Sequence, residues 1–350
     1  MGETAPAAHA GSQAVLHCKG RRNESADFPS SLSEYKGMYM KRDFGRSGGI
    51  ALLLCLCPPL SAQPKETTRL NRLVELFEKG VPPLGVFVSN ISARAAASIS
   101  SSPLDFVIID LEHNPYDPER LENYLLGMTN KARILQKGNL QMDVVPIVRL
   151  PANGRERSEF LIKQVLDLGA FGVIVPHVNN AEDALSAVQA IRFPQRAGAP
   201  DYEPRGHRGV GYGWASRYWG LAGPQYGEKA DLWPLDPAGE LLFWPMVESA
   251  EAVANVRSIL KTPGVSGVFV GPADLAYSLG VPIGDRQAEE AIAKVVAACK
   301  ESGVPCGTLT GEGGVAGRLK QGFRFLAVGT DSGLPGGVQR ALQIGRARQE

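Results

Sequence analysis

From Thr67 onward, short continuous apolar runs alternate with segments in which apolar residues recur at helical spacing. The first helical segment carries Leu70, Leu73 and Phe77, with Thr67 or Thr68 as the expected N-cap and Gly80 at its end. Continuous apolar runs are typical of strands covered on both faces, as in a parallel sheet. The expected strands span 84–88, 105–110, 144–149, 172–175, 241–247, 266–270, 304–309 and 325–328.

Helical segments follow most of these strands. They are expected at 118–128, 156–168, 181–191, 250–260, near 286–301, near 313–321 and in a last stretch that ends near 347. Eight strand-and-helix units in about 280 residues are typical of a (β/α)8 TIM barrel, which we place at 67–348. The alternative is a doubly wound sheet, but no G-x-G-x-x-G follows the first strand.

One connection, 194–240, is much longer than the others. It is rich in Gly, Pro, Tyr and Trp, and a loop of about 45 residues is usually either functional or disordered. Its aromatic content argues against disorder, so we expect it to cap the barrel mouth or to contact a neighbouring subunit. Arg208 and Arg217, which lie in it, are expected at the surface or at such an interface.

Residues 1–62 form an N-terminal extension without helical or strand periodicity until an apolar run at 50–57. That run is too short for a stable membrane span, which needs about 20 residues. Read from Met40, however, basic residues, an apolar stretch and the small-residue site at Ala62 follow in the order of a signal peptide. A start at Met40 would place the protein in the periplasm or outside the cell. The alternatives are a disordered extension or a start codon placed too early, either of which leaves a cytoplasmic protein.

Composition narrows the possible partners. The 37 Lys and Arg residues nearly balance the 36 Asp and Glu residues, for a net charge of +1. A nucleic-acid-binding protein usually shows a basic stripe, so nucleic acid is not expected as a partner. Five Cys and five His, with one unmatched C-x-C at Cys55 and Cys57, argue against structural zinc. Cys299 and Cys306 are expected to be buried, and the sequence leaves open whether they pair in an exported protein.

The polar residues suited to catalysis fall where the expected strands end. Asp110 ends the second strand and His113 follows it, Arg149 ends the third, Glu248 follows the fifth, and Asp274 follows the sixth. In a TIM barrel the loops at the carboxyl ends of the strands converge on one mouth. The sequence therefore predicts a single site that combines carboxylates, one imidazole and one guanidinium.

Six segments in this order resemble the metal-dependent class II pyruvate aldolases of the HpcH/HpaI aldolase/citrate lyase family. They are DFVIIDLEH at 105–113, VPIVRLP at 145–151, KQVLDLGAFGVIVP at 163–176, VES at 247–249, VFVGPADL at 268–275 and AVGTD at 327–331. The resemblance implies a barrel of the phosphoenolpyruvate/pyruvate-binding type and a divalent cation such as Mg²⁺, Mn²⁺ or Co²⁺. It also implies reversible cleavage of a 4-hydroxy-2-oxo acid to pyruvate, or a related 2-oxo acid, and an aldehyde. A homo-oligomer, a hexamer, is expected on the same ground.

The resemblance also implies roles for individual residues. Glu248 and Asp274 would hold the metal, Arg149 would face the substrate oxygen, and His113 with Asp110 would form an acid/base pair. Pro272 and Ala273 would line the substrate site. Two carboxylates suit a hard cation, a divalent cation can stabilise an enolate, and an imidazole can shuttle a proton near neutral pH. A Schiff-base mechanism is not suggested, since no Lys lies at a strand end in these segments.

Two positions depart from the family pattern. Met246 stands where Gln is common and cannot donate a hydrogen bond, and His177 follows Pro176 where Met is common. Both would line the substrate site and leave the particular substrate open.

Other interpretations also remain open. Asp110 could instead bond a loop amide, and Arg149 could form an ion pair with Glu112 or Glu248. The alternative functions are an acyl-CoA lyase of the citrate or malyl-CoA type and a non-catalytic barrel that binds 2-oxo acids.

Overall fold

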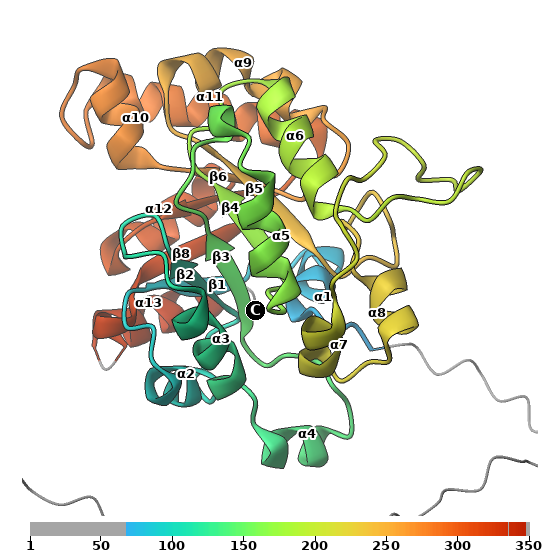
Figure 1. Ribbon diagram of the computed structural model, residues 1–350. Coiled ribbons are helices and arrows are strands. Elements are labelled where there is room, and N and C mark those ends of the chain that lie inside the picture. Colours follow the sequence, from blue (N-terminus) through green and yellow to red (C-terminus); the bar gives the residue numbers. More distant parts are fainter. Residues whose placement is uncertain (1–67, 335, 348–350) are drawn as a thin grey trace, which may run out of the picture. The chain divides into compact units, whose positions relative to one another are not determined.

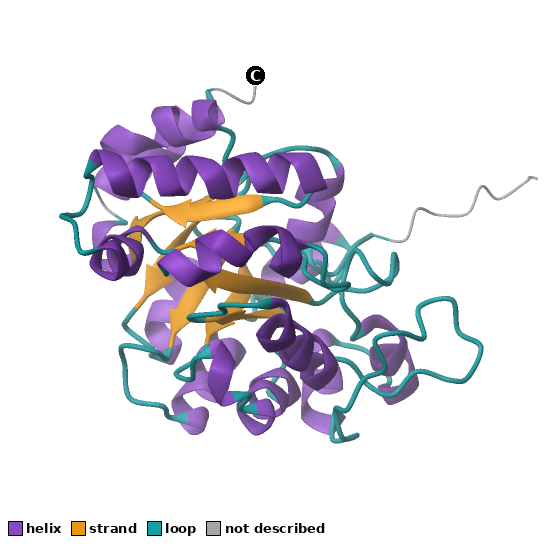
Figure 2. Cartoon of the chain, turned by 90° about the horizontal axis from the view of Figure 1, so that it is seen from above, coloured by secondary structure: helices purple, strands orange, loops and turns teal. Residues whose placement is uncertain are grey.

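The computed structural model describes residues 68–334 and 336–347. Parallel strands close into a barrel in the order β1 to β8, each paired with its sequence neighbours and β8 with β1. Helices surround the strands (Figure 2). The (β/α)8 prediction is therefore confirmed. The strands are β1 Leu84–Val88, β2 Phe106–Asp110, β3 Val145–Arg149, β4 Gly172–Val175, β5 Leu242–Val247, β6 Val268–Val270, β7 Cys306–Leu309 and β8 Phe325–Thr330.

The helices cover the outer face of the barrel (Figure 1). They are α1 Arg72–Glu78, α2 Ala93–Ile99, α3 Pro118–Gly127, α4 Lys131–Lys137, α5 Glu159–Asp167, α6 Ala181–Ile191, α7 Gly213–Trp219, α8 Gly223–Lys229, α9 Ala250–Leu260, α10 Pro272–Leu279, α11 Arg286–Ser302, α12 Val315–Gln321 and α13 Gly337–Arg346. In this part of the chain none of them combines the length and apolarity that crossing a membrane requires.

Several aromatic rings pack together inside the barrel. Phe106 and Trp244 meet edge to face at 5.7 Å between ring centroids, and Trp244 lies 4.3 Å from Phe325. Glycine makes room for them, because a Cβ at Gly307 would lie only 2.1 Å from the Phe325 ring. Packed rings leave no room for a channel, so polar chemistry is confined to the ends of the barrel.

The start of the first helix differs from the expectation. Asn71, and not Thr67 or Thr68, caps α1, because its side chain accepts a hydrogen bond from the amide of Leu73. Asn71 is in turn held by Glu240, whose carboxylate accepts from the Asn71 amide at 3.0 Å. Sequence period alone could not locate this cap, since its partner lies far along the chain.

The long 194–240 segment contains the short helices α7 and α8 and packs outside the barrel, beside α5 (Figure 1). Trp219 donates from Nε1 to the carbonyl of Gly169, and the Tyr226 hydroxyl to that of Leu166. Both carbonyls lie at the carboxyl end of α5, where the chain turns back into β4. Trp219 and Tyr226 therefore attach the segment at the end of the barrel where the strands begin, opposite the mouth. For this part of the segment, the expectation that it caps the mouth is wrong.

Two expectations lie outside what the structure describes. The signal-like segment 40–62 and the rest of the N-terminal extension fall outside the described residues. Since a single chain is present, the hexamer stays a prediction. Cys299 and Cys306, by contrast, lie within the described residues; both are buried, as expected, and both are free. Burial raises the pKa of the Cys306 thiol, and the neighbouring Cys299 raises it further.

Candidate active site

The ends of β2 and β3 bring Asp110 and Arg149 into direct contact. The two residues are register partners in the sheet. Arg149 donates from Nε to Asp110 Oδ1 at 2.9 Å and from Nη2 to Oδ2 at 2.7 Å. This two-point pairing fixes the plane of the guanidinium as well as its position.

Glu112 completes the acceptor set around Arg149. Its Oε2 lies 2.9 Å from Arg149 Nη1, and the guanidinium also stacks over the Phe87 ring at 4.7 Å. Burial raises the pKa of the Glu112 carboxyl, and the Arg149 charge opposes that rise. One cation thus faces two carboxylates at the mouth, so the group as a whole is suited to accept further positive charge.

Glu248 follows β5 and is 1% exposed. The amide of His177 donates to Glu248 Oε1 at 2.7 Å. Burial, with a smaller contribution from the negative charges of Glu112 and Asp274, raises the pKa of Glu248 to about 8, against the opposing effects of the His177 hydrogen bond and the Arg149 charge. A carboxyl of this kind is costly to ionise alone, so its ionised form needs a cation.

The turn after β6 shapes the space beside Glu248. Gly271 has no side chain, and a Cβ there would lie 2.3 Å from Glu248 Oε2. Pro272 and Ala273 open α10, and Asp274 lies in its first turn. Asp274 lies near enough to Glu248 for its negative charge to raise the pKa of that carboxyl.

His177 holds Glu248 through an unusual backbone. Its φ of 48° lies in the left-handed region that residues other than glycine rarely adopt. Its ring is partly exposed, with Nδ1 3.6 Å from Glu248 Oε1. Strain of this kind is maintained when the surroundings demand it, and here it directs an amide at the buried carboxylate.

His113 is set apart from the other predicted residues. Its side chain is 64% exposed, with Nε2 3.8 Å from Glu112 Oε2. The Asp110 carboxylate, expected to orient this ring, is engaged with Arg149. It reaches the His113 loop only through backbone amides, with Glu112 N at 3.0 Å and His113 N at 3.5 Å from Oδ1. Two alternatives that the sequence had left open are thus both present: Asp110 bonds loop amides, and Arg149 forms an ion pair with Glu112.

Met246 lies in β5, two residues before Glu248, and is 2% exposed. Alternation along the strand puts it on the same side as Glu248. It therefore lies below the carboxylate and offers the site an apolar floor.

A second group of carboxylates lies away from the mouth. Asp201, Asp231 and Asp236 place oxygens within 4.8 Å of one another. The fully buried Arg192 donates to Asp231 at 2.6 and 2.7 Å and also pairs with Asp201. Since a guanidinium already supplies the positive charge, we interpret this group as an ion-pair cluster that ties the 194–240 segment to α6.

The sequence of the barrel matches a known protein family. A family model described as HpcH/HpaI aldolase/citrate lyase matches residues 84–335. This chain belongs to that family.

Named relatives of this HpcH/HpaI chain are aldolases, that is, carbon–carbon lyases. It is 31% identical over 268 residues to a hydroxypyruvate/pyruvate aldolase of Roseobacter denitrificans, covering 75% of this chain and 91% of that protein. It is 33% identical over 261 residues to a 2-dehydro-3,6-dideoxy-6-sulfogluconate aldolase of Pseudomonas putida, covering 73% and 89%. A solved HpcH/HpaI family protein from Burkholderia cenocepacia shares 30% identity at a TM-score of 0.61, covering 80% of this chain and 97% of that one.

Two contributors to the site in this HpcH/HpaI barrel had no assigned role in the sequence. Glu112 was considered only as an alternative partner of Arg149, and Gly271 was not singled out. A signal for both was present, because Glu112 is two residues beyond the strand-end Asp110 and Gly271 immediately follows β6. The backbone role of His177 left no such signal, since a positive φ cannot be inferred from a histidine.

Proposed function

We propose that this chain is a divalent-metal-dependent aldolase that cleaves a 4-hydroxy-2-oxo acid to pyruvate, or a related 2-oxo acid, and an aldehyde. The observation that carries the proposal is the buried Glu248, whose pKa is raised to about 8, with the Asp274 charge near it at the mouth that also holds Arg149. The names of the relatives, hydroxypyruvate/pyruvate aldolase among them, support the same class of reaction.

The residues at the mouth fit a hard divalent cation. Glu248 Oε1 accepts one amide, whereas Oε2 accepts no hydrogen bond from a described residue, and Gly271 leaves it unobstructed space. Asp274, in the first turn of α10, lies near enough to raise the pKa of Glu248. Mg²⁺ and Mn²⁺ prefer oxygen ligands such as carboxylates. A bound cation would also offset the repulsion between these two negative charges. Glu248 and Asp274 would hold the ion. When bound, it would supply Lewis acidity to the keto oxygen of a 2-oxo acid.

Arg149 supplies fixed positive charge beside that oxygen. Its orientation is set by Asp110 and Glu112 before any substrate arrives, so no reorganisation is needed as negative charge develops. Pro272 and Ala273 begin α10 beside this space, and they would line the substrate carboxylate. We assign Met246 and His177 to substrate discrimination, because one offers an apolar surface and the other a polar ring.

His113 is proposed to move the proton. Cleavage of the C3–C4 bond needs a base at the C4 hydroxyl, and an imidazole can serve near neutral pH. The exposed ring of His113 can reach an aldehyde-side hydroxyl at the mouth. Its loop is held by the amide bonds to Asp110.

The first test is pyruvate release. Purified full-length protein with Mg²⁺ or Mn²⁺ should release pyruvate from at least one member of a panel of 4-hydroxy-2-oxo acids, measured by coupling to lactate dehydrogenase. A coupled assay with citramalyl and malyl thioesters distinguishes the acyl-CoA lyase. Tight 2-oxo acid binding without turnover on either panel would contradict the proposal and favour a binding barrel.

We further propose that translation starts at Met40, that residues 40–62 act as a signal peptide for export, and that this peptide is cleaved after Ala62. The mature native protein should then begin at Gln63, because the basic, apolar and small-residue order ends at Ala62. Intact-mass measurement and N-terminal sequencing of protein from its native source check this. Recovery of residues 1–62 intact would contradict export.

A further inference from the structure

A cavity of about 500 Å³ lies at the end of the barrel where strands begin, opposite the end that carries Glu248. Its walls are the segments that lead into β1, β7 and β8, among them Val81, Pro305 and Arg324. The proposed mechanism uses none of these residues.

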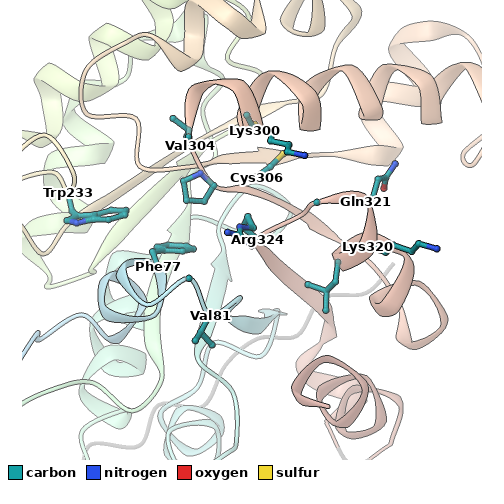
Figure 3. A pocket seen from close by; sticks show the side chains of 15 residues that line it. Phe77, Val81, Trp233, Lys300, Val304, Cys306, Lys320, Gln321 and Arg324 are labelled. Carbon is teal, nitrogen blue, oxygen red and sulfur yellow. The ribbon is translucent and has the colours of Figure 1, made fainter. Parts of the chain in front are cut away.

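One wall of the cavity is aromatic and firmly supported. Phe77 and Trp233 stack with ring centroids 5.9 Å apart and an interplanar angle of 12°. Phe77 also contacts the buried ring of Phe325 at 5.7 Å. Trp233 comes from the long 194–240 segment, so that segment helps to form the cavity. Figure 3 shows Arg324 between this aromatic pair on one side and Gln321 and Lys320 on the other.

The charge of the cavity has a single sign. Lys300, Lys320 and Arg324 line it, and Lys79 lines a hollow that shares Lys320 and Arg324 with it. No Asp or Glu of the described chain lines either space. Lys79 pairs with Glu75. The side chains of the other three cations form no ion pair or hydrogen bond with residues 68–334 or 336–347, whereas Arg149, Arg192 and Arg208 are each paired with carboxylates.

Helix ends do not account for all of this positive charge. The carboxyl ends of α1, α11 and α12 lie at the cavity, and Lys300 and Lys320 lie in the last turns of the latter two. Each helix end carries about half a negative charge at most. About one and a half negative charges therefore face three unpaired cations, which leaves the cavity positive.

We propose that this cavity binds a small organic anion that has a flat apolar part and at least two negative charges, such as a phosphate or dicarboxylate of an aromatic or heterocyclic compound. The volume falls within the range of small-molecule sites, about 300–1,000 Å³. The flat part lies along Trp233 and Phe77. Arg324, with the lysines on either side of it, receives the charged groups, and its planar guanidinium suits a two-oxygen contact.

The test uses naphthalene-1,5-disulfonate as the probe, because it is flat, doubly charged and a poor metal chelator. Binding to the full-length protein is followed by calorimetry and by quenching of tryptophan fluorescence. Arg324→Gln should weaken binding about tenfold or more, since a charge-assisted hydrogen bond contributes roughly 1.5–3 kcal/mol and 1.4 kcal/mol is tenfold. The double variant Lys300→Gln/Lys320→Gln should weaken it similarly. The neutral 1,5-dihydroxynaphthalene should bind at least about tenfold more weakly than the probe.

Lys261→Gln is the matched control, since Lys261 is an exposed cation at the C-cap of α9 and lies outside the cavity. It should leave probe binding unchanged, as should Arg149→Met at the barrel mouth. Pyruvate release should be unaffected by Arg324→Gln. Equal probe affinity in wild type and Arg324→Gln, equal affinity for the neutral diol, or loss of binding in Arg149→Met would each overturn the proposal. None of these outcomes depends on whether the chain is an aldolase.

Discussion

Glu248→Gln should lower pyruvate release by about 10³-fold or more. A bound cation supplies several kcal/mol of transition-state stabilisation, and each 1.36 kcal/mol is a factor of ten in rate. The amide keeps the shape of the side chain and can still accept from His177, but it removes the negative charge that the cation needs. Asp274→Asn should act in the same direction, and chelation with EDTA should reproduce either loss in the wild-type protein. Steady-state assays together with calorimetric titration of Mn²⁺ check this.

Glu251→Gln is the control, because Glu251 is an exposed carboxylate in the first turn of α9, three residues further on. It should bind Mn²⁺ as the wild type does. The pH dependence gives a second check. The pKa of Glu248 is raised to about 8 without metal, so a proton competes with the cation below that pH and the Mn²⁺ affinity should fall by up to about tenfold per pH unit. Wild-type Mn²⁺ affinity in Glu248→Gln would show that the ion is held elsewhere.

The architecture of the barrel could be predicted because its strands are marked by continuous apolar runs. Expected and observed strands agree closely at β1, β4 and β5. The predicted ranges were longer at β6 and β7, where the observed strands begin at Val268 and Cys306. Ser266 is buried and Val304 is half-buried in the segments that lead into these strands, and burial alone does not indicate strand pairing.

The short helices inside the 194–240 segment could not be predicted in the same way. Helices α7 and α8 have seven residues each, too few for a helical period to stand out, and both contain glycine. They are held by tertiary contacts, such as the stack of Trp219 on Phe171 at 4.2 Å. Short helices draw most of their stability from packing of this kind, which the local sequence does not display.

At the candidate site, positions could be predicted but partners could not. The strand ends placed Asp110, Arg149 and Glu248 at one mouth, since topology alone requires it. Which carboxylate each cation contacts depends on register and on side-chain direction. Adjacent strands in register bring Asp110 opposite Arg149, whereas the exposed His113 ring lies three residues further on in a loop, where no strand register fixes its partner.

This pairing leads to an expected result for Asp110→Asn, which should lower kcat/KM by on the order of 10²-fold, chiefly through Arg149. The substitution exchanges one acceptor oxygen for an NH₂ group that faces an N–H of Arg149, so the guanidinium should lose its fixed orientation. Losing one oriented donor to a developing oxyanion costs about 10²–10³ in rate. Arg149→Met should therefore cost as much or more, and His113→Ala should cost 10²-fold or more as the loss of a positioned base.

Double variants decide through which residue Asp110 acts. Asp110 bonds the guanidinium directly, so the two residues should act as a unit, and their losses should not multiply. The kcat/KM of Asp110→Asn/Arg149→Met should therefore be little lower than that of Arg149→Met alone. Asp110→Asn/His113→Ala should instead show the product of the two single losses, since the Asp110 carboxylate reaches only the backbone of the His113 loop. Mn²⁺ affinity should hardly change in any of these variants, and circular dichroism should confirm that each is folded. If Asp110→Asn/His113→Ala is no slower than His113→Ala alone, this assignment is contradicted. That result would mean that, once substrate binds, the imidazole contacts the Asp110 carboxylate, which Arg149 binds in the substrate-free protein.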